Sequence, residues 1–133
     1  MAWGVPISTC MGVRQFTDLD AWKLSVELKR NVYRLATIDA VRRDRLYCEQ
    51  LTTAAASAPA NIAEGFARFQ HADFMRFLRI AIGSLDELEN HLIDGVDRGH
   101  FPASEIESAR VLKRRSAAAV ASLIRYLRQS KAP

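Results

Sequence analysis

The stretch F-M-R-F-L-R-I-A-I-G-S-L-D-E-L-E-N-H-L, residues 74–92, carries apolar side chains at alternating spacings of four and three. The members of this series are Phe74, Leu78, Ala81, Leu85, Leu88 and Leu92. Such spacing places the side chains on one face of an α-helix and is typical of helices that pack at small angles. The stretch therefore predicts a long amphipathic helix over about residues 71–97.

The same periodicity appears on both sides of this stretch. It predicts further helices over about residues 18–37, 44–66 and 102–130, and no segment has the alternation of a strand. Because short connections make neighbouring helices antiparallel, we expect an all-α, up-down-up-down four-helix bundle over residues 16–130. Residues 1–15 lack periodicity and are expected to form a flexible leader.

The length and composition restrict the function classes. A chain of 133 residues fits one domain. Its apolar runs are too short to cross a bilayer and its first residues lack a signal-peptide pattern, so we expect a cytoplasmic protein without membrane contact. No phosphate loop, nucleophile elbow or zinc pattern occurs, which favours a non-enzymatic protein with no catalytic residues, cofactor or metal. His71 and His100 lie near predicted helix ends and are expected to be solvated.

The positive charge is concentrated in the last segment. Residues 103–133 contain 7 Lys and Arg against 2 Asp and Glu, whereas residues 1–102 contain 12 against 13. Projection at 100° per residue places most of these cations in one sector of the fourth helix, away from its apolar face. The members of this stripe are Arg110, Lys113, Arg114, Arg125, Arg128 and Lys131. It is either an ordinary solvated face or a surface that binds the phosphates of RNA or DNA.

A second polar pattern runs through the helix interior. In P-A-N-I-A-E-G-F-A-R, residues 59–68, the polar side chains follow the inward spacing of the second helix, and a polar stripe on the third helix could face them. The members of the predicted strip are Asn61, Glu64, Arg68, Ser84 and Glu87. Buried polar groups need hydrogen-bond partners, so the strip is expected to be a structural network; a subunit contact and a ligand site are the alternatives.

Three strings in the sequence resemble a known family. D-L-D-A-W-K (18–23), S-A-P-A-N-I-A-E-G-F-A-R (57–68) and F-M-R-F-L-R-I-A-I-G-S-L-D-E-L-E (74–89) are similar to the motifs of the four-helix-bundle proteins encoded in 23S rRNA intervening sequences. The resemblance implies a homopentameric ring with no established enzymatic activity. A related bundle, the accessory protein of diversity-generating retroelements, binds reverse transcriptase and nucleic acid.

Two function classes follow from these observations. The first is a nucleic-acid-binding or ribonucleoprotein adaptor, and the second is a protein-interaction scaffold, including a partner of reverse transcriptase. For either class we expect a homo-oligomer, because helices one and three carry more apolar surface than one bundle seam needs. Trp22, Phe74 and Phe77 are the large side chains expected to be partly buried against other subunits.

Overall fold

The structure, a computed structural model, describes residues 12–130, and this part of the chain is helical without any strand. The all-α prediction is confirmed. The four long helices are α2 (Asp20–Leu35), α4 (Arg45–Phe66), α5 (His71–Asp97) and α6 (Glu107–Gln129). The short elements are η2 (Phe16–Asp18), α3 (Asp39–Arg43) and η3 (Ala103–Ile106).

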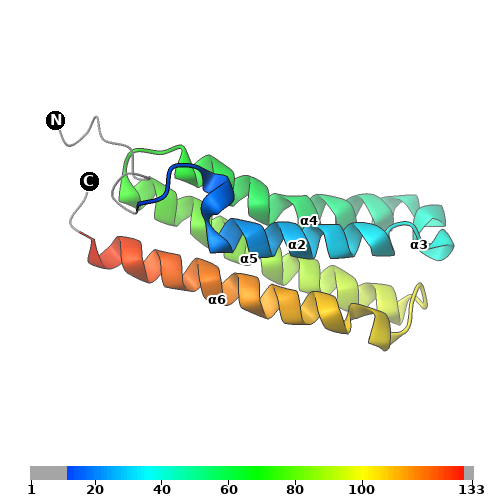
Figure 1. Cartoon of the computed structure of the whole chain (residues 1–133). Helices are drawn as coiled ribbons and strands as arrows, with labels where there is room; N and C mark the ends of the chain where they lie inside the picture. The colour runs from blue at the N-terminus through cyan, green and yellow to red at the C-terminus, as the bar shows by residue number, and fades with distance from the viewer. Residues whose placement is uncertain (1–11, 131–133) are drawn as a thin grey trace.

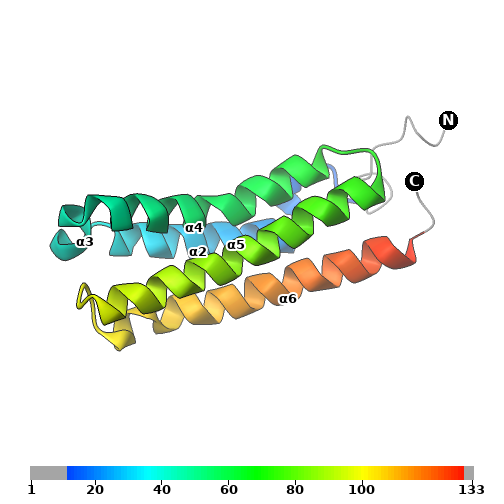
Figure 2. The ribbon, with the colours of Figure 1, turned by 180° about the vertical axis from the view of Figure 1, so that it is seen from behind.

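The long helices enclose one shared core. α2 packs against α4 and α6, and α5 packs against the same two helices. Figures 1 and 2 show the four helices side by side, with the colour gradient running in opposite directions along successive ones. Leu51, Ile62, Phe74, Leu85, Leu92 and Val120 are among the fully buried side chains. The apolar series of residues 74–92 therefore lies in the core, as its spacing predicted.

Two connections differ from the expected ones. The segment before the second long helix contains the additional helix α3, which buries Val41 completely. The last helix begins at Glu107 rather than near residue 102, because Pro102 has an extended backbone and is followed by the 3-10 turn η3. Phe101 and Ile106 are buried, so this turn is anchored to the bundle by its apolar side chains.

The unusual composition of α4 has a packing explanation. Pro59 is buried inside the helix, which continues through it to Phe66. A Cβ atom added at Gly65 would lie 2.8 Å from the Cβ of Phe77 and 2.9 Å from the Cδ1 of Phe74. Only glycine allows α4 and α5 to come this close.

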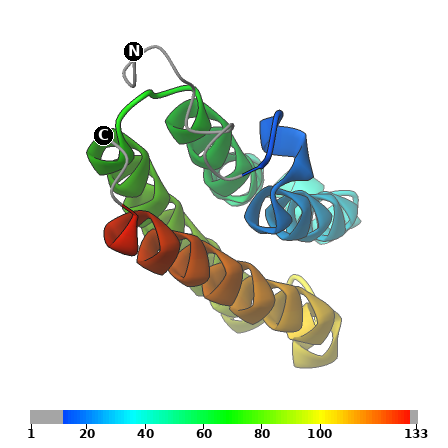
Figure 3. The same cartoon turned by 60° about the vertical axis from the view of Figure 1, so that its left-hand side comes forward.

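The expected leader lies mostly in residues 1–11, outside the described residues. Within the described part, Val13 and Phe16 pack against the core. Phe16 also contacts Trp22 edge-to-face with ring centroids 5.4 Å apart. Figure 3 shows η2 lying over the start of α2. No helix within residues 12–130 is both long and apolar enough to cross a membrane.

Candidate nucleic-acid interface

The inner part of the predicted polar strip is a small hydrogen-bond network between α4 and α5. Asn61 Nδ2 donates to the Ser57 carbonyl oxygen at 2.9 Å and to Ser57 Oγ at 3.2 Å. The hydroxyls of Ser57 and Ser84 lie 2.7 Å apart, and Ser84 Oγ donates to the Ile80 carbonyl oxygen. Since a hydroxyl has one proton, Ser57 donates to Ser84. Ser57 thus joins Asn61 to Ser84, a role that the sequence analysis missed.

The outer part of the strip is not buried, contrary to expectation. Arg68 donates to Glu64 at 2.7 Å, and both side chains are about half exposed. The guanidinium groups of Arg68 and Arg76 lie over the ring of Phe77, 4.8 and 4.6 Å from its centroid. Glu64 reaches solvent from the last turn of α4, and Arg68 lies just beyond the end of that helix. They form an exposed ion pair and contribute little to a buried network.

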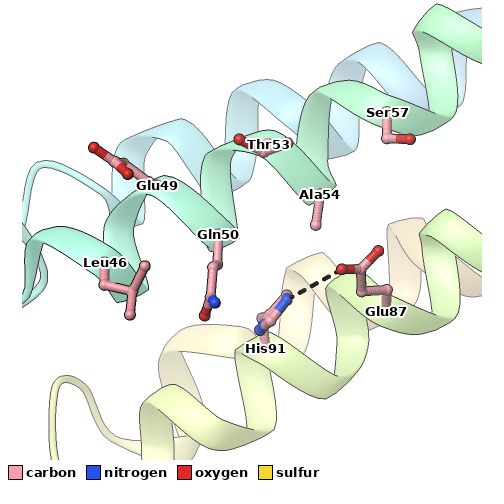
Figure 4. Close-up of a pocket in the computed structure, with 8 residues that line it drawn as sticks. All are labelled: Leu46, Glu49, Gln50, Thr53, Ala54, Ser57, Glu87 and His91. Carbon is pink, nitrogen blue, oxygen red and sulfur yellow. Dashed lines mark ion pairs between the residues drawn. The ribbon is translucent and has the colours of Figure 1, made fainter.

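Glu87, the last member of the strip, borders a groove between α4 and α5 with a volume of about 360 Å³. The groove is lined by Leu46, Glu49, Gln50, Thr53, Ala54, Ser57, Glu87 and His91. Figure 4 shows Gln50 and Ala54 pointing from α4 toward α5, and Glu87 beside His91, with Oε1 3.5 Å from the imidazole Nε2. Within residues 12–130, no group of three or more His, Cys, Asp or Glu side chains is placed to hold a metal ion.

Two members of the predicted basic stripe are paired with carboxylates of α5. Arg110 Nε lies 2.9 Å from Glu89 Oε2, and Lys113 Nζ lies 2.8 Å from Asp86 Oδ1 and 3.0 Å from Glu89 Oε1. The hydrogen bond to Asp86 raises the pKa of the Lys113 ammonium, and the hydrogen bond from Lys113 lowers the pKa of Glu89. These cations are neutralised within the protomer, so the stripe is shorter than the sequence predicts.

The remaining described members stay accessible. Arg114, Arg125 and Arg128 are exposed, and none forms an ion pair with any residue from 12 to 130. Lys131 lies outside the described residues. Guanidinium groups present several N–H donors that match the oxygens of a phosphate. The outer face of α6 therefore presents guanidinium donors that have no ion-pair partner among the described residues.

Comparison with known families agrees with this architecture. The family profile of the 23S rRNA-intervening sequence protein matches residues 17–122. The chain belongs to this family. No curated protein matches it in sequence. The resemblance noted from the three sequence strings is thus confirmed.

In this 23S rRNA-intervening sequence protein, the structure contains one polar cluster around Asp44 that was not predicted from the sequence. It lies where α5 ends and α4 begins. Asp44 caps α4 by accepting from the Tyr47 amide, and its Oδ2 lies 2.8 Å from His100 Nε2 and 3.0 Å from an Arg98 nitrogen. The hydrogen bond with His100 is the main cause that holds the pKa of Asp44 below its usual value. Tyr47 donates to the His91 carbonyl oxygen, and burial raises its pKa to about 12.

The expectation that His71 and His100 are solvated was wrong. His100 is hydrogen-bonded to Asp44, and its ring packs at a tilt against the ring of Tyr47 with centroids 5.1 Å apart. His71 is buried at the start of α5, and neither ring nitrogen has a hydrogen-bond partner within residues 12–130. A position near a helix end does not by itself mean exposure, because other parts of the chain can cover that end. The one available signal for the cluster was Asp44, an N-cap residue type directly before a helical pattern.

Proposed function

We propose that this member of the 23S rRNA-intervening sequence protein family is a non-enzymatic oligomeric adaptor that binds the phosphate backbone of RNA or DNA. The observation that carries the proposal is the set of exposed arginines Arg114, Arg125 and Arg128, which have no ion-pair partner in residues 12–130. An exposed cation can exchange its counterion for a phosphate without breaking an existing contact. The family name is consistent with a ribonucleoprotein setting but does not identify a ligand.

The second part of the proposal concerns assembly. The chain forms an up-down-up-down bundle, and copies of it assemble into a homo-oligomeric ring with five members. Support comes from large apolar side chains that the protomer leaves exposed, among them Leu46 and Phe69, 66% and 56% exposed. A ring would repeat the arginines of α6 in every subunit. Several weak phosphate contacts then act together and reach useful affinity.

Salt-dependent binding tests the first part. Log affinity should fall linearly with log salt, with a slope near −0.9 per phosphate contact on duplex DNA and near −0.7 on single strands. Filter binding between about 50 and 200 mM salt covers the range in which multi-contact binders lose most affinity. The double variant Arg114→Gln/Arg128→Gln should weaken binding to all sequences alike and flatten the slope. Absence of binding at the lowest salt would refute the nucleic-acid role.

A protein-interaction scaffold is the second candidate function, including a role as an accessory to a reverse transcriptase. The observation in its favour is the groove between α4 and α5, which has Leu46 exposed at its rim and a floor formed by Ala54. Such a groove could accept side chains of a protein partner. A scaffold of this kind would not bind nucleic acid, and the Arg114→Gln/Arg128→Gln change would not affect its binding of a protein partner.

A further inference from the structure

The ion pairs between α5 and α6 establish how these two helices are aligned. Arg110 pairs with Glu89, and Lys113 pairs with Asp86. Three residues forward along α6 thus correspond to three residues back along α5, so the helices are antiparallel in a defined register. Extending this register from the Lys113–Asp86 pair brings Arg79 level with Val120. Arg79 therefore lies at a level between Arg114 and Arg125.

The same pairs show on which side of each helix the next arginines lie. Arg79 precedes Asp86 by seven residues, about two turns, so it lies on the side of α5 that borders α6. Arg128 follows Arg110 by eighteen residues, about five turns, so it lies on the side of α6 that borders α5. Both arginines border the α5–α6 seam beyond its ion-paired end.

This further part of the seam carries no negative charge. Residues 74–85 of α5 and residues 108–129 of α6 contain no Asp or Glu. Arg79 is exposed and, like the α6 arginines described above, forms no ion pair within residues 12–130. The seam thus has a neutralised end and a purely cationic end, a division that the stripe on α6 alone does not reveal.

Small residues lie beside the arginines at the cationic end. Ala117 follows Lys113 by one turn, and Ala121 follows Arg114 by two. Gly83 is exposed one turn after Arg79, and a Cβ atom there would meet no atom of residues 12–130 within 4 Å. The surface beside the guanidinium groups therefore has low relief at these three positions, which allows a polymer backbone to approach the helices closely there.

We propose that Arg79 of α5 joins Arg114, Arg125 and Arg128 of α6 in one surface that binds the phosphodiester backbone of RNA or DNA. This inference rests on the proposed function and names the surface that performs it. Compared with the stripe on α6, the surface includes a residue of α5 and excludes the ion-paired end of α6. The fourteen steps from Arg114 to Arg128 extend about 21 Å along α6. Along the axis of a duplex, one strand has a phosphate every 3.4 Å or so. The surface therefore has the axial length of about six base pairs.

The deciding experiment compares single Arg→Gln variants of the full chain by filter binding. The ligands are a single-stranded RNA and a duplex DNA of equal length, which distinguish the two sources of the backbone. Loss of one phosphate contact at ~0.1 M salt should weaken binding about eightfold on duplex DNA and about fivefold on single-stranded RNA, because affinity varies as the inverse 0.9 or 0.7 power of salt per contact. Arg79→Gln should show this loss, and reduce the magnitude of the salt slope by about one, for each subunit that contacts the ligand. Arg79→Lys, which keeps the charge, should retain most of the affinity.

Two neighbouring arginines serve as matched controls. Arg76 is three residues before Arg79, but its guanidinium lies over Phe77, away from the seam. Arg115 follows Ser108 by two turns, and Ser108 accepts a hydrogen bond from Asn31 of α2, so Arg115 lies on the α2 side. Arg76→Gln and Arg115→Gln carry the same charge change and should weaken binding much less. If Arg76→Gln and Arg79→Gln lost the same affinity, the proposal would be overturned, because the affinity would then depend on net charge and not on the position of the arginine.

The failure of this inference differs from the failure of the proposed function. If Arg114→Gln and Arg128→Gln weaken binding and Arg79→Gln does not, the function stands and the extension to α5 is refuted. If the wild-type chain binds neither ligand, both are refuted. Gly83→Glu provides a second check, since the added carboxylate has space and should reduce binding without changing helicity or oligomer size. A changed oligomer size would show that a second copy covers this surface and would overturn the proposal.

Discussion

At the scale of single residues, Gly65 shows why the N-I-A-E-G motif contains a glycine inside a helix. Glycine weakens a helix by up to about 1 kcal/mol relative to alanine, so its presence in α4 needs a compensating gain. The gain is contact with Phe74 and Phe77 across the α4–α5 interface. Gly83 is also helical, but in the part of the chain that the structure describes no such neighbour lies near it. The two glycines therefore offer a direct comparison.

We expect Gly65→Ala to lower the free energy of unfolding by about 1–3 kcal/mol, since the new methyl group would overlap two aromatic side chains in a packed interface. Gly83→Ala should instead raise the free energy of unfolding by about 0.5–1 kcal/mol through helix propensity. Urea denaturation followed by circular dichroism measures both. Equal effects of the same sign would contradict the close approach of α4 and α5 at Gly65.

At the scale of elements, the long helices were predictable because each repeats its apolar spacing over several turns. The helix α3 was not, because five residues, Asp39–Arg43, are too few to show a period. The contacts of Asp44 were hidden for another reason: its partner His100 is 56 residues away in the sequence. Likewise, projection of one helix placed Arg110 correctly on α6 but could not reveal Glu89 opposite it. Periodicity predicts on which face of a helix a residue lies. Predicting an ion pair between two helices also requires the register between them.

The Asp44 contacts predict an acid-sensitive junction between α4 and α5. The folded-state pKa of Asp44 is lowered, chiefly by His100, so its carboxylate stabilises the fold above the unfolded pKa of about 3.9. This contribution is lost as the pH falls through the lower folded-state value. Asp44→Asn retains an N-cap side chain but removes the charge, so stability should depend less on pH below about 4. Urea melts between neutral and acid pH measure this dependence.

A charge-matched control separates this junction from general acid effects. Asp97→Asn removes a carboxylate that is exposed at the end of α5. The stability of the Asp97→Asn variant should therefore depend on acid pH as the stability of the wild type does. If both variants follow the wild-type profile, the Asp44–His100 contact does not contribute to stability at neutral pH.

At the scale of the whole molecule, the exposed apolar side chains favour assembly into an oligomer. Phe74, expected between subunits, is fully buried in the protomer core, and Trp22 packs against the core beside Phe16. Phe74 needs no second copy for burial, and Trp22 is already partly buried within the protomer. The side chains that would gain from assembly are instead Leu46, Phe69, Ile80, Ile93 and Val111, each more than 40% exposed. Apolar side chains of this size contribute about 25 cal/mol per Å² when an interface removes them from water.

We therefore expect the purified chain to sediment as a homo-oligomer at micromolar concentration. Five copies of 14.9 kDa give a mass of about 75 kDa, the value expected for the proposed ring. Assembly by burial of apolar surface should persist in high salt, because the hydrophobic effect is not screened, whereas nucleic-acid binding through the arginines should be lost. Sedimentation equilibrium at about 50 mM and 1 M salt tests both statements. A mass of 14.9 kDa at either salt concentration would contradict the ring and leave each protomer with only its own arginines for phosphate binding.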